Sequence, residues 1–275
     1  MDLTSKETMH FVDAPFLRDL SFCLRFYTRL PIPALGGETD PHGTENGFER
    51  LTRAVRVLPL AGVLIGGFGA AVLLLTSWIG FGPWLAGPLS ILALILATGG
   101  LHEDGLADCA DGFAGGFSVA RKLEIMRDSR LGTYGVLALI LALWLRIAGL
   151  ATIGEGSLVL AAFVLVAAAA LSRTMALLPL SILPPARADG AGFNAGRPSP
   201  VIVIQAFGLA AAVGLLPLAA GASLLRVLFA LAIALAAAYG LTRLAYTQIR
   251  GHTGDVAGAV QQIVEIVYLL CFAAG

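Results

Sequence analysis

Three aspartates near the middle of the chain have the spacing of a metal site. Asp104, Asp108 and Asp111 lie four and then three positions apart in the glycine-rich stretch 99–116. On a helix these spacings place the three carboxylates on one face, where they repel one another unless a cation is present. Carboxylate oxygens favour a hard ion, and Mg²⁺ commonly bridges one or two of them to substrate phosphates. We therefore predict that the aspartates are catalytic and bind Mg²⁺; a solvated acidic helix end is the alternative.

Basic residues follow the aspartates within twenty positions and supply the opposite charge. Arg127 and Arg130 are three apart, with Asp128 between them, so on a helix they would share a face and could hold phosphate oxygens. Arg121 and Lys122 fit that role and the role of a basic loop anchor equally well. The segment from Arg127 to Arg130 is therefore predicted to bind a phosphorylated substrate.

Polar residues near the C-terminus are further candidates for this site. In the stretch 250–259, Thr253 and Asp255 stand among glycines that suit backbone contact with an anion, and Asp255 could be a fourth metal carboxylate. The alternative is that the pair caps a helix N-terminus. Glu265 lies in an apolar stretch, where an ionisable group indicates a functional residue or a packing partner. His102 could act as a base, although such a histidine is more often only a hydrogen-bonding residue.

Two features are left open by the sequence. The loop 184–196 carries Arg187, Asp189 and Asn194 and is either a substrate lid or an ordinary loop. Glu103 lies one step off the face that the three aspartates share, and its position does not define a role.

The elements that position these residues are predicted to be membrane-spanning helices. Of the 275 residues, 57% are hydrophobic and 13% are charged, whereas a soluble domain carries about 25% charged residues. The formal net charge is zero, which argues against binding to nucleic acid. Three cysteines far apart in the sequence predict neither a disulfide framework nor a zinc site.

Long apolar stretches define the spans, because a bilayer core of about 30 Å needs about 20 apolar residues in a helix. We predict an all-α, polytopic integral membrane helix bundle of seven transmembrane helices, with six as the alternative, in a single domain over residues 1–275. Glycine and alanine inside the spans favour close approach of helices. The predicted spans are residues 55–77, 84–101, 132–151, 157–180, 199–219, 223–245 and 257–274.

An interfacial helix is predicted before the first span, over residues 16–30. Arg18, Phe22, Arg25 and Arg29 fall near one face of this helix, and leucines lie largely opposite. This pattern is typical of a helix that lies on the membrane surface.

The distribution of basic residues predicts the orientation. All but two of the 18 Lys and Arg residues fall on one side of the predicted spans, which leaves Arg146 and Arg226 on the other side. Because basic loops stay in the cytoplasm, the acidic and basic stretches are expected to face the cytoplasm and the C-terminus to point outward.

Three classes of protein fit this pattern. The first is an intramembrane transferase that acts on a pyrophosphate-linked substrate, with Mg²⁺ and arginines stabilising charge on the leaving phosphate. An ion or solute carrier would place its acidic residues near the middle of the membrane, and a structural subunit would not need so dense a cluster of both charges. The transferase is favoured.

Five motifs resemble those of the cobalamin synthase family, the adenosylcobinamide-GDP ribazoletransferases. They are LHEDGLADCADG at 101–112, LEIMRDSRLGTYG at 123–135, HTGDVAGA at 252–259, RLPIP at 29–33 and LPLAGVLIG at 58–66. The resemblance covers most of the chain in order. Glu103, where members often carry an apolar residue, and Arg250, where a glycine is usual, depart from the family pattern.

The resemblance implies a multi-pass enzyme of the bacterial inner membrane that completes the nucleotide loop of adenosylcobalamin. It would join adenosylcobinamide-GDP to α-ribazole, or to its 5′-phosphate, and release GMP with Mg²⁺ as cofactor. The implied partners are these small molecules and membrane lipids, and a second copy of the same chain could be a further partner. Asp104, Asp108 and Asp111 would hold the metal. The sequence does not settle which carboxylate is the base, and Asp108 and Asp111 are the candidates. The implied substrate-binding residues are Arg127, Asp128, Arg130, Thr253 and Asp255.

A second family with related chemistry is the alternative. CDP-alcohol phosphotransferases also use spaced Asp–Gly pairs with Mg²⁺, but their motif has an arginine where this sequence has Asp108. The similarity therefore indicates analogous chemistry.

Overall fold

The computed structural model describes residues 15–35, 45–189 and 196–274. Within these ranges all regular structure is helical, apart from an isolated bridge between Pro185 and His252. The prediction of an all-α protein is therefore confirmed. The helices are α1 (Pro15–Tyr27), α2 (Glu45–Ala54), η2 (Val55–Val57), α3 (Leu58–Trp78), α4 (Pro83–Thr98), α5 (Leu101–Gly115), α6 (Val119–Ile125), α7 (Thr133–Gly156), α8 (Leu158–Met175), α9 (Leu177–Ile182), α11 (Pro200–Val213), η3 (Leu216–Ala220), α12 (Leu224–Ile249) and α13 (Gly254–Ala273).

Six helical stretches in the described part of the chain are long and apolar enough to cross a membrane, and a bent pair of helices raises the number to seven. This range agrees with the sequence prediction. The bent pair is α4 and α5, which meet at an angle of 90°. The predicted span over 84–101 ends three residues early as a helix, at Thr98, because Gly99 and Gly100 both adopt the left-handed conformation, with φ of 67° and 69°, and stop α4.

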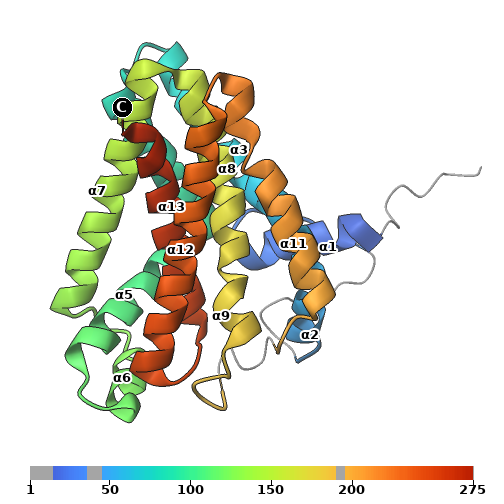
Figure 1. Cartoon of the computed structure of the whole chain (residues 1–275), viewed down its shortest axis with the longest axis vertical. Coiled ribbons are helices and arrows are strands. Elements are labelled where there is room, and N and C mark those ends of the chain that lie inside the picture. Colours follow the sequence, from blue (N-terminus) through green and yellow to red (C-terminus); the bar gives the residue numbers. More distant parts are fainter. Residues whose placement is uncertain (1–14, 36–44, 190–195, 275) are drawn as a thin grey trace, which may run out of the picture.

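The centre of the bundle is built by close contact between α3 and α8 (Figure 1). Gly62 and Gly66 of α3 lie directly against the alanine run of α8, and a β-carbon on Gly62 would come within 2.5 Å of the Ala170 Cα. Residues 167–170 are fully buried. The predicted role of small residues in bringing helices together is confirmed at this contact.

Helix α1 forms over most of the predicted segment but ends at Tyr27, three residues before the predicted end, and lies at a large angle to the long helices of the bundle (Figure 1). The helix face that carries Phe22 packs into the protein, because its side chain is fully buried in a cluster with Leu51 and Leu58. After the helix, the backbone N–H of Arg29 donates to the carbonyl oxygen of Ala97 at 2.7 Å. The chain after α1 is thereby attached to the end of α4.

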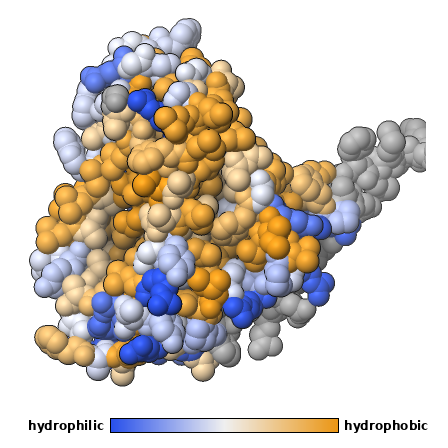
Figure 2. Space-filling view, in the orientation of Figure 1, coloured by the Kyte–Doolittle hydropathy of each residue, from blue (hydrophilic) through white to orange (hydrophobic). Residues whose placement is uncertain are grey.

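Polar and apolar residues separate along the bundle. Figure 2 shows hydrophobic side chains over the middle of the visible body and hydrophilic ones at both of its ends, one of which holds α6 and the link between α12 and α13. The C-terminus lies at the opposite end (Figure 1). Of the segments that the sequence analysis assigned to one side of the membrane, α2, α6 and the link between α12 and α13 lie at the same end of the molecule (Figure 1).

Candidate active site

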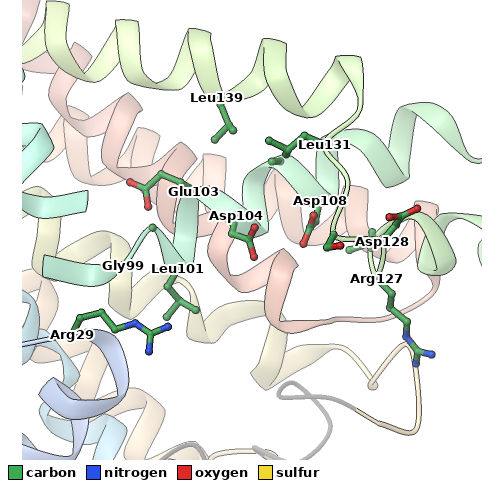
Figure 3. Close-up of a pocket in the computed structure, with 14 residues that line it drawn as sticks. Arg29, Gly99, Leu101, Glu103, Asp104, Asp108, Arg127, Asp128, Leu131 and Leu139 are labelled. Carbon is green, nitrogen blue, oxygen red and sulfur yellow. The ribbon is translucent and has the colours of Figure 1, made fainter. Parts of the chain in front are cut away.

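A cavity of about 640 Å³ lies beside α5, next to the segment that joins α6 to α7. Asp104 and Asp108 line it one helical turn apart, and Figure 3 shows both carboxylates directed into the same space. The structure therefore brings two of the three predicted metal ligands together. The cavity is lined by Arg29, Gly99, Gly100, Leu101, Glu103, Asp104, Ala107, Asp108, Met126, Arg127, Asp128, Ser129, Leu131 and Leu139.

The glycines around these aspartates pack helices together. A β-carbon on Gly105 would lie 2.8 Å from the backbone oxygen of Asp255 in α13, and one on Gly112 would lie 3.0 Å from the backbone oxygen of Lys122 in α6. Close contact with two helices thus fixes α5 on either side of Asp108, so that the aspartates are held on a rigid element.

Negative charge is concentrated at Asp108. The carboxylates of Asp104, Asp111 and Asp255 all repel a charge on this residue, and Arg187 is the cation that offsets them. Neither Asp104 nor Asp108 takes part in an ion pair with another residue of the described ranges. Two free carboxylates in a region of negative potential favour the binding of a cation.

Asp111 points to a different neighbour and does not line the cavity. Its side chain is only 8% exposed and accepts the backbone N–H of Gly132 at 2.7 Å and that of Gly135 at 2.8 Å. These donors belong to the start of α7, where N–H groups have no partner within the helix. In this structure Asp111 therefore caps α7, instead of joining the expected cluster of three.

The metal-ligating potential of the site rests on two carboxylates. Among the residues that the structure describes, no group of three or more His, Cys, Asp or Glu side chains is arranged to hold a metal ion. Asp104 and Asp108 do fit Mg²⁺, which takes one or two carboxylates and completes its shell with water and substrate phosphates.

The two predicted phosphate-binding arginines point to separate partners. Arg127 contributes to the cavity wall, but its guanidinium turns away to form an ion pair with Asp189 (Figure 3). The guanidinium of Arg130 binds Asp128, and the arginine side chain is 87% exposed. This hydrogen-bonded pair lowers the pKa of Asp128 to about 2. The structure does not bring Arg127 and Arg130 together on one face.

Thr253 and Asp255 form the N-terminus of α13. The Thr253 hydroxyl accepts the N–H of Val256 at 3.3 Å and donates to Asp255 Oδ2 at 3.0 Å. The helix-cap alternative is thus correct for Thr253. Asp255 also receives a contact from Arg187 at 3.5 Å.

Arg187 and Arg29 are charged residues of the site whose roles the sequence did not assign. Arg187 belongs to the loop whose role was left open, and Asn194 of that loop lies outside the described residues. Arg29 was assigned to a helix face, whereas its side chain packs against Gly99 and reaches the cavity (Figure 3). The place of Arg29 in the RLPIP motif was the feature of the sequence that could have identified it as a residue of the site.

A buried network of charges lies behind the cavity. Arg146 was predicted to lie on the outer side of the membrane, but it is 2% exposed inside the bundle and binds both Glu265 and Glu103 at 2.7 Å. Arg173 lies 3.8 Å from Glu265 as well. Glu265 therefore has the charged partners that its position in an apolar helix indicated, and Glu103 joins this network to the cavity wall.

The fold and the site together define a polytopic helical membrane protein with a carboxylate-lined cavity flanked by arginines. Comparison with known proteins gives its family. The model of the cobalamin-5-phosphate synthase family matches residues 19–273. The chain therefore belongs to the cobalamin-5-phosphate synthase family, and it is an enzyme of cobalamin synthesis.

Curated relatives of this family are similar over nearly their whole length. A protein of Azorhizobium caulinodans is 44% identical over 254 residues, which cover 92% of this chain and 94% of the relative. One of Xanthobacter autotrophicus is 46% identical with the same coverage, and one of Bradyrhizobium diazoefficiens is 43% identical over 94% of each chain. All three are named adenosylcobinamide-GDP ribazoletransferase. No solved structure matches this chain.

Proposed function

We propose that this protein transfers the cobinamide phosphate of adenosylcobinamide-GDP to α-ribazole, or to its 5′-phosphate, and releases GMP. The observation that supports this most directly is a pair of carboxylates, Asp104 and Asp108, that have no ion-pair partner in the described part of the chain and line a cavity together with Arg29. A site of this kind suits a diphosphate that is bound together with a divalent ion. The motif resemblance and the names of the curated relatives supply the substrates.

The reaction is a displacement at phosphorus. A hydroxyl oxygen of the ribose forms a bond to the phosphorus that carries cobinamide, and the bond from that phosphorus to the bridging oxygen of the diphosphate breaks. The bridging oxygen and its electron pair leave with GMP. The hydroxyl proton passes to a carboxylate of the site.

Each charged residue of the cavity has a role in this reaction that follows from its position. Asp104 and Asp108 would hold Mg²⁺, which neutralises charge on the diphosphate when it is bound. Arg29 would contact phosphate oxygens from the opposite wall. Of the two candidates for the base, Asp108 is favoured over Asp111, because both oxygens of Asp111 already accept backbone N–H groups.

The contact between Arg127 and Asp189 and the orientation in the membrane are two further parts of this proposal. The ion pair from Arg127 to Asp189 would connect the cavity wall to the loop after α9, and a diphosphate would compete with Asp189 for that guanidinium. The end of the bundle that holds the cavity would face the cytoplasm of a bacterium, with the C-terminus outward and lipids around the apolar surface.

The test is an assay of the purified protein in liposomes. Adenosylcobinamide-GDP, α-ribazole and Mg²⁺ are supplied, and GMP release is measured. Asp104→Asn and Asp108→Asn are expected to lose at least about a hundredfold in kcat/KM, the typical cost of removing a group that stabilises charge in the transition state. Glu124→Gln is the matched control, since Glu124 is exposed at the same end of the bundle and its ion pair is with the neighbouring, exposed Arg121. Normal turnover by both aspartate variants, or no GMP from the wild type, contradicts the proposal.

A further inference from the structure

A second cavity of about 170 Å³ adjoins the acidic one, and the two share Leu101 and Asp104. Helices α1, α5, α9 and α13 meet around it. Its wall is mostly apolar and includes the rings of Phe26 and Tyr27 and the side chain of Leu180. Asp104 therefore stands at the junction of a polar cavity and an apolar one.

The aromatic part of this wall has a fixed geometry. The rings of Tyr27 and His102 stack in parallel, with centroids 5.9 Å apart and 1° between their planes. Phe26 meets Tyr27 edge to face at a centroid distance of 4.8 Å. Both Tyr27 and His102 line the cavity, so a flat apolar group inside it would be bounded by ordered rings.

The polar part of the wall defines what else the occupant must carry. Asp104 and Asp255 line the cavity together. Ionised carboxylates only accept hydrogen bonds, so a suitable ligand must bring O–H or N–H donors. Asp255 already accepts the Thr253 hydroxyl and contacts Arg187, whereas Asp104 has no ion-pair partner among the described residues. A hydrocarbon chain would desolvate Asp104 without giving it a partner, which is costly. The cavity thus favours a molecule that is aromatic at one end and hydroxylated at the other.

We infer that this second cavity binds the aromatic base of the acceptor nucleoside and presents its ribose hydroxyls toward Asp104. The volume supports a ring system alone, because it is smaller than the roughly 300–1,000 Å³ of pockets that enclose whole drug-sized ligands. The sugar then lies at the shared wall, beside the cavity assigned to the diphosphate. This inference rests on the proposed function and adds to it a separate place for the second substrate.

A cavity-filling variant tests the assignment. Leu180→Trp places a larger side chain in the cavity and is expected to raise KM for α-ribazole by about tenfold or more, with KM for adenosylcobinamide-GDP little changed. The matched control is Ile182→Trp, because Ile182 is on the same short helix, is exposed and lies outside this cavity. An unchanged KM for α-ribazole, or an equal rise in both KM values, overturns the inference.

A second variant keeps the test decisive if the tryptophan impairs folding. Leu180→Ala enlarges the cavity and is expected to shift the ratio of kcat/KM values toward acceptors with a bulkier base by about tenfold. An unchanged ratio overturns the inference. Failure of the proposed function has a different signature, since the wild type itself would then release no GMP with any acceptor.

Discussion

Neutralising Glu265 should unbalance the charges buried inside the bundle. Its carboxylate is fully buried, lies 2.7 Å from Arg146 and 3.8 Å from Arg173, and accepts the amide of Gln261 at 2.6 Å. In Glu265→Gln, two guanidiniums share the single remaining carboxylate of Glu103. Removing one partner of a buried ion pair costs about 3–5 kcal/mol of unfolding free energy. The apparent melting temperature in detergent should therefore fall by on the order of 10 °C.

A double variant separates charge balance from packing. Glu265→Gln with Arg173→Met leaves the pair of Arg146 and Glu103, 2.7 Å apart, as a balanced unit. We expect the double variant to be more stable than Glu265→Gln alone by about 1 kcal/mol or more, within the usual range of coupling between contacting residues.

The assay is thermal or urea unfolding of the purified proteins, followed by circular dichroism in one detergent. Glu155→Gln is the control: Glu155 is exposed and accepts the indole N–H of Trp84, so its replacement should change the unfolding free energy by less than about 0.5 kcal/mol. If Glu265→Gln is as stable as the wild type, or if adding Arg173→Met destabilises it further, the electrostatic reasoning is refuted.

Three further predictions concern the site. Asp111→Asn keeps one acceptor oxygen for the two N–H groups that start α7. Its free energy of unfolding in urea should therefore be lower than that of the wild type by about 1–2 kcal/mol. An unchanged midpoint of the urea transition would exclude the capping role. Gly99→Ala places an alanine in the left-handed conformation against the side chain of Arg29. The backbone conformation alone should lower the free energy of unfolding by about 1–2 kcal/mol. A melting temperature at or above that of the wild type would contradict this prediction. Arg130 lowers the pKa of Asp128 to about 2, so the stability from this pair is present above the unfolded pKa of about 4 and is lost as the pH falls through 2. Arg130→Ala should therefore return the pKa of Asp128 toward about 4, as measured by NMR of its carboxyl group. An unchanged pKa of Asp128 in this variant would show that the pair does not exist in solution.

Hydropathy and helical spacing predict the fold class and the pairing of Asp104 with Asp108, because both depend on local pattern. Asp111 shares that helix face, yet it lies two turns along α5 from Asp104, where the backbone of α7 begins. The start of α7 decides its role, and spacing within α5 carries no information about that neighbour.

The position of Arg146 could not be predicted for a similar reason. An apolar span over 132–151 leaves this residue near one end, whereas α7 runs from Thr133 to Gly156 and places it well inside. What stabilises a charge there is Glu265, more than a hundred positions away. Such pairs depend on how α7 and α13 pack, so hydropathy alone places the arginine outside the membrane.

The most direct test of the central claim is the binding of a divalent ion at Asp104 and Asp108. Mn²⁺ can replace Mg²⁺ as a paramagnetic probe, and free Mn²⁺ is measured by EPR during titration of the protein with adenosylcobinamide-GDP present. We predict saturable binding in the wild type and in Glu124→Gln, and its loss in the Asp104→Asn/Asp108→Asn variant. Equal Mn²⁺ affinity in all three proteins would contradict the account.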